Sequence, residues 1–582
     1  MIQKFLYFFN KNQKRSLIIL FAFMLMATSL EMIGLGFVFS IIGSLGSLST
    51  ISGKDNILIE TINNLFEASP SEIFLYLLII FLFFYIIKII FLIFYNWFEG
   101  NFLYSYRENL SSRVFKQYLT QNYNYFYNRN SSEFIRNLIT EVDQFIIYLT
   151  CVLKVLLESV IVVGIFLLLA YINLIFTISI SLIFLFFSFS YLFLFKEKLN
   201  IWGKQRLADT QKRIQFMQEG FDGVKIIKLL GRENFFFNKF KVHNVNLSKI
   251  TTKTYFFSNL PRLLFELLGI FLITFLLFYL FLSGKNLTEI IQIITVYVAA
   301  SFRILPSANR LVSSLQLIKL SYPAVNALYK ELKSFKKEEE NFHKNFIFNK
   351  NIVLEIQKFK YPNSNNFEIS DIKLEITKGQ KIGIIGPTAS GKSTIIEILA
   401  GINMPTIGSV TVDGKSIFSN IRGWQNLIGF VPQKIFILDE SLRSNILFGL
   451  DNKKYSDEKI ISLIKKLSLG NLLNRLPNGL DGFLGEEGTN LSGGEIQRIG
   501  ICRALIYNPE ILVLDEATSS LDINTESQIL DELKSFREKT IISIAHRINS
   551  LKYSDIIYNI SKGQLLDQGN FEKFKSAEYT GG

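Results

Sequence analysis

The chain has 582 residues, of which 49% are hydrophobic and only 19% are charged, and it contains 56 phenylalanines. With a mean hydropathy of +0.29, this composition is typical of an integral membrane protein. The formal charge of +13 would also suit a nucleic-acid-binding protein, but membrane proteins gather Lys and Arg on their cytoplasmic side, so no nucleic-acid partner is expected. The two cysteines, Cys151 and Cys502, indicate no disulfide framework and no metal cluster.

Apolar runs long enough to cross a bilayer as helices occur six times. They cover residues 17–42, 73–95, 146–170, 173–195, 261–283 and 291–320. The first run has no small-residue cleavage site, which predicts an uncleaved span. The segments 97–145 and 196–255 carry five and thirteen Lys/Arg residues, whereas 43–72 and 284–290 carry one each. This asymmetry places both termini in the cytoplasm.

The two basic segments lack Gly/Pro clusters, so we expect them to extend the membrane helices as helical hairpins. Between the first two spans, residues 55–67 alternate apolar and polar residues at helical spacing. This pattern fits a helix on the outer membrane surface. It fits an ordinary packed loop helix equally well.

Hydropathy falls after the last span, which divides the chain into a membrane domain at 1–322, a charged linker at 323–350 and a soluble domain at 351–582. In the soluble domain, the short Val/Ile-rich runs "KIGIIG", "LIGFVPQ", "ILVLDEA" and "TIISIAH" alternate with helical stretches. The alternation predicts an α/β domain with a parallel sheet.

A P-loop follows the first of these strands. The nine residues "GPTASGKST" match G-x-x-x-x-G-K-[ST] and precede a helical run. Backbone N–H groups of such a loop bind phosphates, Lys392 reaches the β/γ oxygens and the Ser393 hydroxyl binds Mg²⁺. The predicted ATP-binding residues are Gly386, Pro387, Thr388, Ala389, Ser390, Gly391, Lys392, Ser393 and Thr394.

Two adjacent acids end the strand "ILVLDEATSSLD". We expect Asp515 to hold Mg²⁺ and Glu516 to polarise the attacking water. Taken alone, the pair would also fit a solvated strand end, but the P-loop favours the catalytic interpretation.

The stretch "NLSGGEIQRIGICRAL" at 490–505 resembles the signature motif of ATP-binding cassette (ABC) transporters. The sequence departs from the usual pattern in having Glu495 where Gln is common and Ala389 where Gly is frequent. The resemblance covers the whole chain. It implies the exporter fold, with six membrane helices and an α/β P-loop nucleotide-binding domain.

Further family elements occur in the expected order. The resemblance assigns Tyr361 to stacking on adenine, Gln433 to the Mg²⁺ and catalytic site, and His546 to a γ-phosphate contact. From the residues alone, Tyr361 could be an ordinary strand end and Gln433 an ordinary turn. His546 could be a structural histidine, but its place beside two acids and a P-loop favours the γ-phosphate contact.

One cassette and six spans imply a homodimer with two ATP sites. In such a dimer, Ser492, Gly493 and Gly494 of one subunit close on the P-loop of the other. The hairpin segments 126–137 and 219–231 resemble the short helices through which such transporters contact their cassettes.

Cations at membrane depth are costly and mark function. They are Lys88, Arg262, Arg303 and Arg310. Structural alternatives are snorkelling for Lys88, an i,i+4 pair with Glu266 for Arg262, and a place near a helix end for Arg310. Arg303 has no acid within one turn. Lys154 and Glu158 are expected to neutralise each other.

Arginines bind phosphate in bidentate fashion, so these four residues predict an anionic amphiphile as substrate. The runs "PRLLFELLG" and "FRILPSANRL" resemble PglK-type flippases, which implies a polyprenyl-pyrophosphate-linked oligosaccharide in a bacterial inner membrane. Export of another lipid or of drugs is the alternative. A peptidase-exporter would need a catalytic Cys and His before the first span, and a regulatory ATPase or channel would predict a degenerate catalytic base.

Overall fold

The computed structural model describes residues 2–47, 70–127, 129–172, 174–284, 287–335, 346–361, 367–519, 521–536 and 538–576. These residues form two compact units. The first comprises Met1–Gln121 and Arg129–Lys337, and the second comprises Asn122–Asn128 and Glu338–Gly582. The helix predicted at 55–67 lies outside the described residues.

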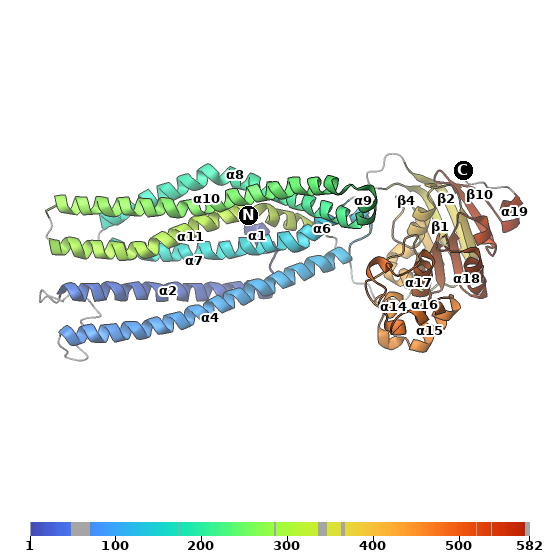
Figure 1. Cartoon of the computed structure of the whole chain (residues 1–582), viewed down its shortest axis with the longest axis horizontal. Coiled ribbons are helices and arrows are strands. Elements are labelled where there is room, and N and C mark those ends of the chain that lie inside the picture. The colour runs from blue at the N-terminus through green and yellow to red at the C-terminus, as the bar shows by residue number, and fades with distance from the viewer. Residues whose placement is uncertain are drawn as a thin grey trace. The chain divides into compact units, whose positions relative to one another are not determined.

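Long helices running side by side build the first unit (Figure 1). A short α1 (Ile2–Tyr7) precedes them. The long helices are α2 (Lys11–Ser47), α4 (Pro70–Leu119), α7 (Val142–Ile172), α8 (Leu174–Asp222), α10 (Glu233–Leu282) and α11 (Leu287–Ser334). Four of the six predicted spans fall within one long helix each, and the spans 173–195 and 261–283 overlap α8 and α10 over all but one residue.

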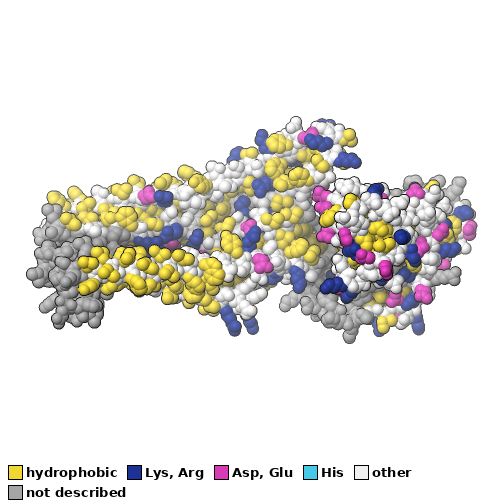
Figure 2. Space-filling model, turned by 60° about the horizontal axis from the view of Figure 1, so that its bottom comes forward, with side chains coloured by type: hydrophobic (Ala, Val, Ile, Leu, Met, Phe, Trp, Pro, Cys, Tyr) yellow, Lys and Arg dark blue, Asp and Glu magenta, His cyan; other side chains and the backbone are white. Residues whose placement is uncertain are grey.

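Five helices among the described residues are long and apolar enough to cross a membrane, and they overlap the first five predicted spans. The sixth predicted span lies within α11, which contains Pro306 and Pro323. Figure 2 shows mostly hydrophobic side chains over one half of the helical unit and more Lys and Arg side chains over the other half. Such a division is typical of helices that extend from a bilayer into water.

The two basic segments continue the long helices, as predicted. α4 runs on to Leu119, α8 runs on to Asp222 and α10 starts at Glu233. Short elements join the long helices. These are α5 (Asn124–Tyr127), α6 (Ser131–Arg136), the π-helical turn Asn137–Glu141 and α9 (Val224–Leu230).

α11 does not end where the sequence predicted a linker. It continues to Ser334, so the first part of 323–350 is helical. The prediction was wrong there because it followed hydropathy, whereas this part of α11 buries Ala324, Val325, Leu328 and Leu332 against other helices.

The second unit contains two sheets. An antiparallel sheet has the order β2-β1-β4-β5, and a six-stranded sheet has the order β10-β9-β3-β8-β7-β6. In the second sheet, β3, β6, β7, β8 and β9 are parallel, and β10 is antiparallel to β9. The strands are β1 (Asn351–Phe359), β2 (Ile369–Thr377), β3 (Lys381–Ile385), β4 (Ile407–Val412), β5 (Lys415–Ser416), β6 (Ile428–Val431), β7 (Ile511–Asp515), β8 (Thr540–Ile544), β9 (Ile556–Ser561) and β10 (Gln564–Gly569).

The four Val/Ile-rich runs of the sequence became β3, β6, β7 and β8, as predicted. All five residues of β7 are buried, which explains its unbroken run of apolar residues. The carboxyl ends of β3 and β7 lie two strands apart at one edge, so the P-loop and the acids that follow β7 meet there.

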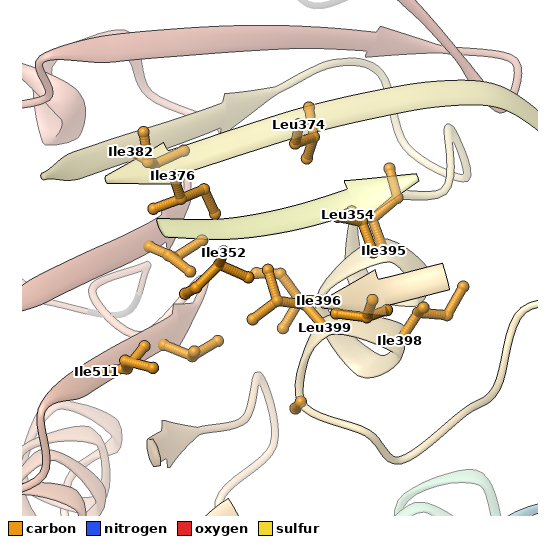
Figure 3. Close-up of a cluster of buried hydrophobic side chains, with 14 of the residues drawn as sticks. Ile352, Leu354, Leu374, Ile376, Ile382, Ile395, Ile396, Ile398, Leu399 and Ile511 are labelled. Atoms are coloured by element: carbon orange, nitrogen blue, oxygen red, sulfur yellow. The ribbon is translucent and has the colours of Figure 1, made fainter. Parts of the chain in front are cut away.

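A buried core joins the two sheets to α12 (Lys392–Leu399), the helix that follows the P-loop. Figure 3 shows side chains of β1 and β2 on one side of this core, with Ile395, Ile396 and Leu399 of α12 on the other. Since α12 packs into the core, the loop before it is held on a rigid support. The remaining helices are α13 (Ile421–Gln425), α14 (Leu442–Leu447), α15 (Asp457–Lys466), α16 (Gly470–Arg475), α17 (Gly493–Leu505), α18 (Ile523–Ser535) and α19 (Phe571–Ser576).

Candidate functional site: a nucleotide site and charged clusters among the membrane helices

The P-loop adopts backbone conformations that favour glycine. Gly386 and Gly391 have φ of +149° and +104°, and a Cβ on Gly386 would lie 1.9 Å from the carbonyl oxygen of Ile560. Ala389 also has a positive φ, +62°, although it is not glycine. The loop is therefore held in a phosphate-cradle shape at a cost in strain at Ala389.

Lys392 is the first residue of α12, and its ammonium group folds back over the loop. Its Nζ donates to the carbonyl oxygens of Gly386 and Pro387, both at 2.8 Å. Burial lowers the pKa of Lys392, and the nearby carboxylates Glu516 and Asp515 oppose this shift. Ser390 Oγ is buried with no hydrogen-bond partner among the described residues. A lysine and an unpaired hydroxyl at a helix N-terminus fit the phosphates of a nucleotide.

Ser393 and Asp515 lie together at the carboxyl edge of the sheet. Ser393 Oγ donates to Asp515 Oδ1 at 3.3 Å. Burial raises the pKa of Asp515, whereas the hydrogen bond from Ser393 lowers it. Two hard oxygen donors side by side fit Mg²⁺, which takes few protein ligands and completes its shell with phosphate oxygens and water.

Glu516 contacts two other predicted site residues. Its Oε2 accepts a hydrogen bond from Gln433 Nε2 at 2.7 Å, and its Oε1 lies 2.6 Å from His546 Nε2. Glu516 also has a positive φ of +50°, a strained conformation of the kind found at functional sites. The structure thus brings the three residues predicted as catalytic into direct contact around Glu516.

Tyr361 is held at the edge of the same region. Its hydroxyl lies 3.0 Å from both Thr394 Oγ1 and Glu397 Oε2, and burial raises its pKa. The ring stacks on Tyr127 of α5, a residue that belongs to the same compact unit. Sequence analysis did not single out Tyr127 or Glu397.

The signature segment begins α17. Ser492 is the N-cap, and its Oγ accepts from the N–H of Glu495, while Glu495 Oε2 accepts from the N–H of Ser492 at 2.8 Å. Glu495 also forms an ion pair with Arg475 at 3.1 Å. The departure from Gln is therefore accommodated by a capping box and a cation.

The membrane-depth cations are paired, contrary to expectation for Arg303. Glu31 of α2 forms an ion pair with Arg303 and lies 3.9 Å from Lys88 Nζ. Glu31 was not predicted as a partner, because the cations that it contacts are on other helices. The sequence did contain a signal for Glu31, since Glu31 is the one acid in the first predicted span. Two cations share one carboxylate, which leaves one excess positive charge in this cluster.

Arg310 pairs with Glu158 of α7, which corrects the expectation that Glu158 neutralises Lys154. Arg262 pairs with Glu266 at 2.9 Å, which was the structural alternative for this residue. Arg262 and Arg310 nevertheless line one pocket of about 390 Å³, the charged pocket. Its other lining residues are Glu266, Ser301, Phe302, Leu305, Pro306 and Asn309. The four cations thus divide into two sites.

Comparison with known proteins gives two family matches. Residues 369–519 match the model of the ABC transporter, and residues 17–305 match that of the ABC transporter transmembrane region. A solved structure of a bacterial Atm1-family ABC exporter with ATP bound superposes with a TM-score of 0.80 at 18% identity, over 98% of both chains. At 18% identity, this structural similarity shows a shared fold and nothing more.

Among curated relatives, the uncharacterized ABC transporter ATP-binding protein YknU of Bacillus subtilis is 30% identical over 61% of this chain and 61% of its own length. The lactococcin-G-processing and transport ATP-binding protein LagD of Lactococcus lactis is 32% identical over 62% of this chain and 51% of its own length. The chain thus spans less than two thirds of the length of these relatives.

Proposed function

Because this chain belongs to the ABC transporters, as an exporter with fused transmembrane and ATP-binding domains, we propose that it moves a polyprenyl-pyrophosphate-linked oligosaccharide across a bacterial inner membrane. Hydrolysis of ATP drives the transport. Both termini and the ATP-binding domain lie in the cytoplasm in this proposal, in agreement with the Lys/Arg bias of the predicted cytoplasmic segments.

The nucleotide site supports the ATPase half of the proposal. The P-loop N–H groups and Lys392 would hold the phosphates, and Ser393, Asp515 and Gln433 would hold Mg²⁺, which would supply positive charge next to the phosphates. Glu516 accepts a hydrogen bond from the attacking water and orients it. His546 sits where it holds the glutamate side chain at 2.6 Å and can contact the γ-phosphate.

A second copy of the chain completes the site in this proposal. The N–H groups of Gly493 and Gly494, which follow the N-cap Ser492, lie in the first turn of α17, where backbone N–H groups have no intrahelical partner. Such a helix start binds the phosphates of a nucleotide held by the P-loop of a second subunit. A homodimer then has two equivalent ATP sites.

The excess positive charge in the cluster of Lys88, Glu31 and Arg303 supports the substrate part of the proposal. Lys88, Glu31 and Arg303 have side chains that are 10%, 16% and 26% exposed, so this charge is shielded from water. Arg303 Nε is buried without a hydrogen-bond partner among the described residues. A pyrophosphate would both offset the excess positive charge of the cluster and accept a hydrogen bond from this donor. The oligosaccharide and polyprenyl identities rest on the resemblance to PglK-type flippases.

The test is flipping of a fluorescent lipid-linked oligosaccharide in proteoliposomes, with ATP hydrolysis measured on the same preparation. Arg303→Ala should lower flipping strongly and leave hydrolysis in detergent largely intact, because the cassettes alone carry out hydrolysis. The flipping rate of Arg303→Lys should fall between those of the wild type and Arg303→Ala, since lysine supplies charge without the fork of N–H donors. Arg310→Ala should show the same pattern, and Lys88→Ala and Arg262→Ala should show it more weakly, because these two residues have plausible structural roles.

Leu182→Ala is the matched control, because Leu182 is 61% exposed on α8 and carries no charge. Unchanged flipping in the Arg303→Ala, Arg310→Ala double variant would make these arginines structural and contradict the proposed substrate. Flipping of an uncharged fluorescent lipid at the same rate would favour the alternative, an exporter of another lipid or of drugs.

A further inference from the structure

An apolar cavity of about 420 Å³ lies among four helices of the first unit. Residues of α7, α8, α10 and α11 form its walls, and most of them are aliphatic or aromatic, including Phe166, Phe184, Leu185, Leu272 and Ile304. The hydroxyls of Thr177 and Tyr297 lie 3.1 Å apart and satisfy each other. A space of this size with so few polar groups fits an apolar occupant.

The apolar cavity adjoins the charged pocket. Ser301 and Leu305 of α11 line both spaces, so one helix separates a region for hydrocarbon from a region with arginines. Gly269 lies opposite Leu305, and a Cβ at that position would be 3.2 Å from Leu305 Cδ1. The missing side chain of Gly269 therefore leaves room for Leu305 at the junction.

The charged pocket retains hydrogen-bonding capacity. Arg262 uses Nε to bind Glu266, and its side chain is 68% exposed. Arg310 binds Glu158 and Ser307 and is 40% exposed. Each guanidinium has five N–H donors, so donors remain for a ligand.

From these neighbouring spaces we propose that each subunit binds one phosphate-bearing lipid, with a hydrocarbon chain in the apolar cavity and the phosphate group in the charged pocket. This inference rests on the proposed function, because it assigns a binding site to part of the proposed lipid substrate. It adds a site within a single subunit, apart from the cluster at Glu31. The two arginines select the phosphate, and the cavity selects the chain.

The probe is a photoactivatable hexadecyl phosphate with a diazirine near the end of its chain, added to the full-length protein in phosphatidylcholine vesicles. Adducts located by mass spectrometry should fall on cavity-lining residues of α8 and α11. The same chain on a trimethylammonium group should label these residues about tenfold less, a factor that corresponds to 1.4 kcal/mol. Equal labelling by both probes would show ordinary surrounding lipid and overturn the proposal.

A pair of variants separates the cavity from the lipid-facing surface. Ser181→Phe fills the cavity from α8 and should lower labelling about tenfold, whereas Leu182→Phe, at the next residue and 61% exposed, should not change it. Ala308→Phe fills the cavity from α11 and replaces Ser181→Phe if that variant lacks wild-type ATPase activity in detergent. Wild-type labelling in a folded filled variant overturns the inference.

The outcomes also separate this site from the proposed substrate. Specific labelling together with no flipping of the oligosaccharide lipid supports the site and contradicts only the substrate. A variant with a filled cavity that is no longer labelled by the probe is also tested for flipping. If it flips the oligosaccharide lipid at the wild-type rate, the substrate does not bind in this cavity. That result would overturn this part of the inference, and the proposed function would stand.

Discussion

The ring of Tyr127 lies parallel to the ring of Tyr361, with centroids 4.6 Å apart and planes 7° from parallel. Phe359 packs against Tyr361 with its centroid at 4.9 Å and an interplanar angle of 80°. A base stacked between the two tyrosines would require about twice the observed separation. If Tyr361 stacks on adenine, as the resemblance to the family implies, then adenine must displace Tyr127.

We therefore predict that Tyr127→Ala tightens ATP binding. A stacked aromatic pair contributes about 0.5–1.5 kcal/mol, so the dissociation constant should fall by between about two- and tenfold. The measurement is equilibrium binding of a fluorescent ATP analogue to the full-length protein. Tyr123→Ala is the control, because Tyr123 is 50% exposed on the same segment and should leave binding unchanged. Weaker binding in Tyr127→Ala would instead make Tyr127 part of the nucleotide site.

Glu516→Gln should abolish ATP turnover while ATP still binds. The carboxylate orients water, and the P-loop holds the phosphates, so only the chemical step depends on it. Lys392→Ala should instead weaken nucleotide binding itself. Phosphate release and nucleotide binding are measured on the same samples. Glu510→Gln, at an acid with a 40% exposed side chain just before β7, should behave as wild type. Phosphate release at the wild-type rate in Glu516→Gln would refute the assigned role.

Ala389→Gly should stabilise the nucleotide-free protein. Ala389 has φ of +62°, a conformation that costs a residue with a Cβ about 1 kcal/mol. The thermal midpoint of the ATP-binding unit should rise by about 2–4 °C. Ala400→Gly is the control of opposite sign, because Ala400 has φ of −70° at the end of α12 and should lose stability. A lower midpoint in Ala389→Gly would show that the methyl group makes contacts that outweigh the strain.

The ion pair between Glu495 and Arg475 predicts a pH dependence. Burial alone would raise the pKa of Glu495, but hydrogen bonds from Ser492 and the cation of Arg475 outweigh it and lower the pKa. A lowered folded-state pKa contributes stability that is present above the unfolded value, about 4.3, and is lost as the pH falls through the folded value. Glu495→Gln should thus be less stable than wild type at pH 7, with a difference that shrinks below about pH 4.

Urea unfolding of the full-length protein at a series of pH values measures this difference. Glu355→Gln is the control, because its pair with Lys373 is 3.8 Å long and exposed, and such pairs contribute little. A stability difference for Glu495→Gln that stays constant from neutral to acid pH would show that the charge on Glu495 has no role.

The sequence by itself determined the nucleotide site and the fold class. The P-loop, the acids after β7 and the helix-capping signature are local patterns, because each depends on residues within a few positions of one another and on the strand or helix beside them. The carboxyl edge of a parallel sheet then brings the P-loop and the two acids together without further information. This is why Ser393 lies beside Asp515, as the motifs predicted. Gln433 and His546, which the resemblance to the family assigned, lie beside Glu516.

Only the tertiary structure decided which charges face each other among the helices. Helical periodicity fixes the face on which Arg303 lies, but it does not fix which helix packs against that face or at what height. The partner of Arg303 is Glu31 on α2, the partner of Arg310 is Glu158 on α7, and Tyr361 meets Tyr127 on α5. An ion pair or a ring stack between elements distant in sequence depends on the packing of the whole chain, which no local pattern specifies.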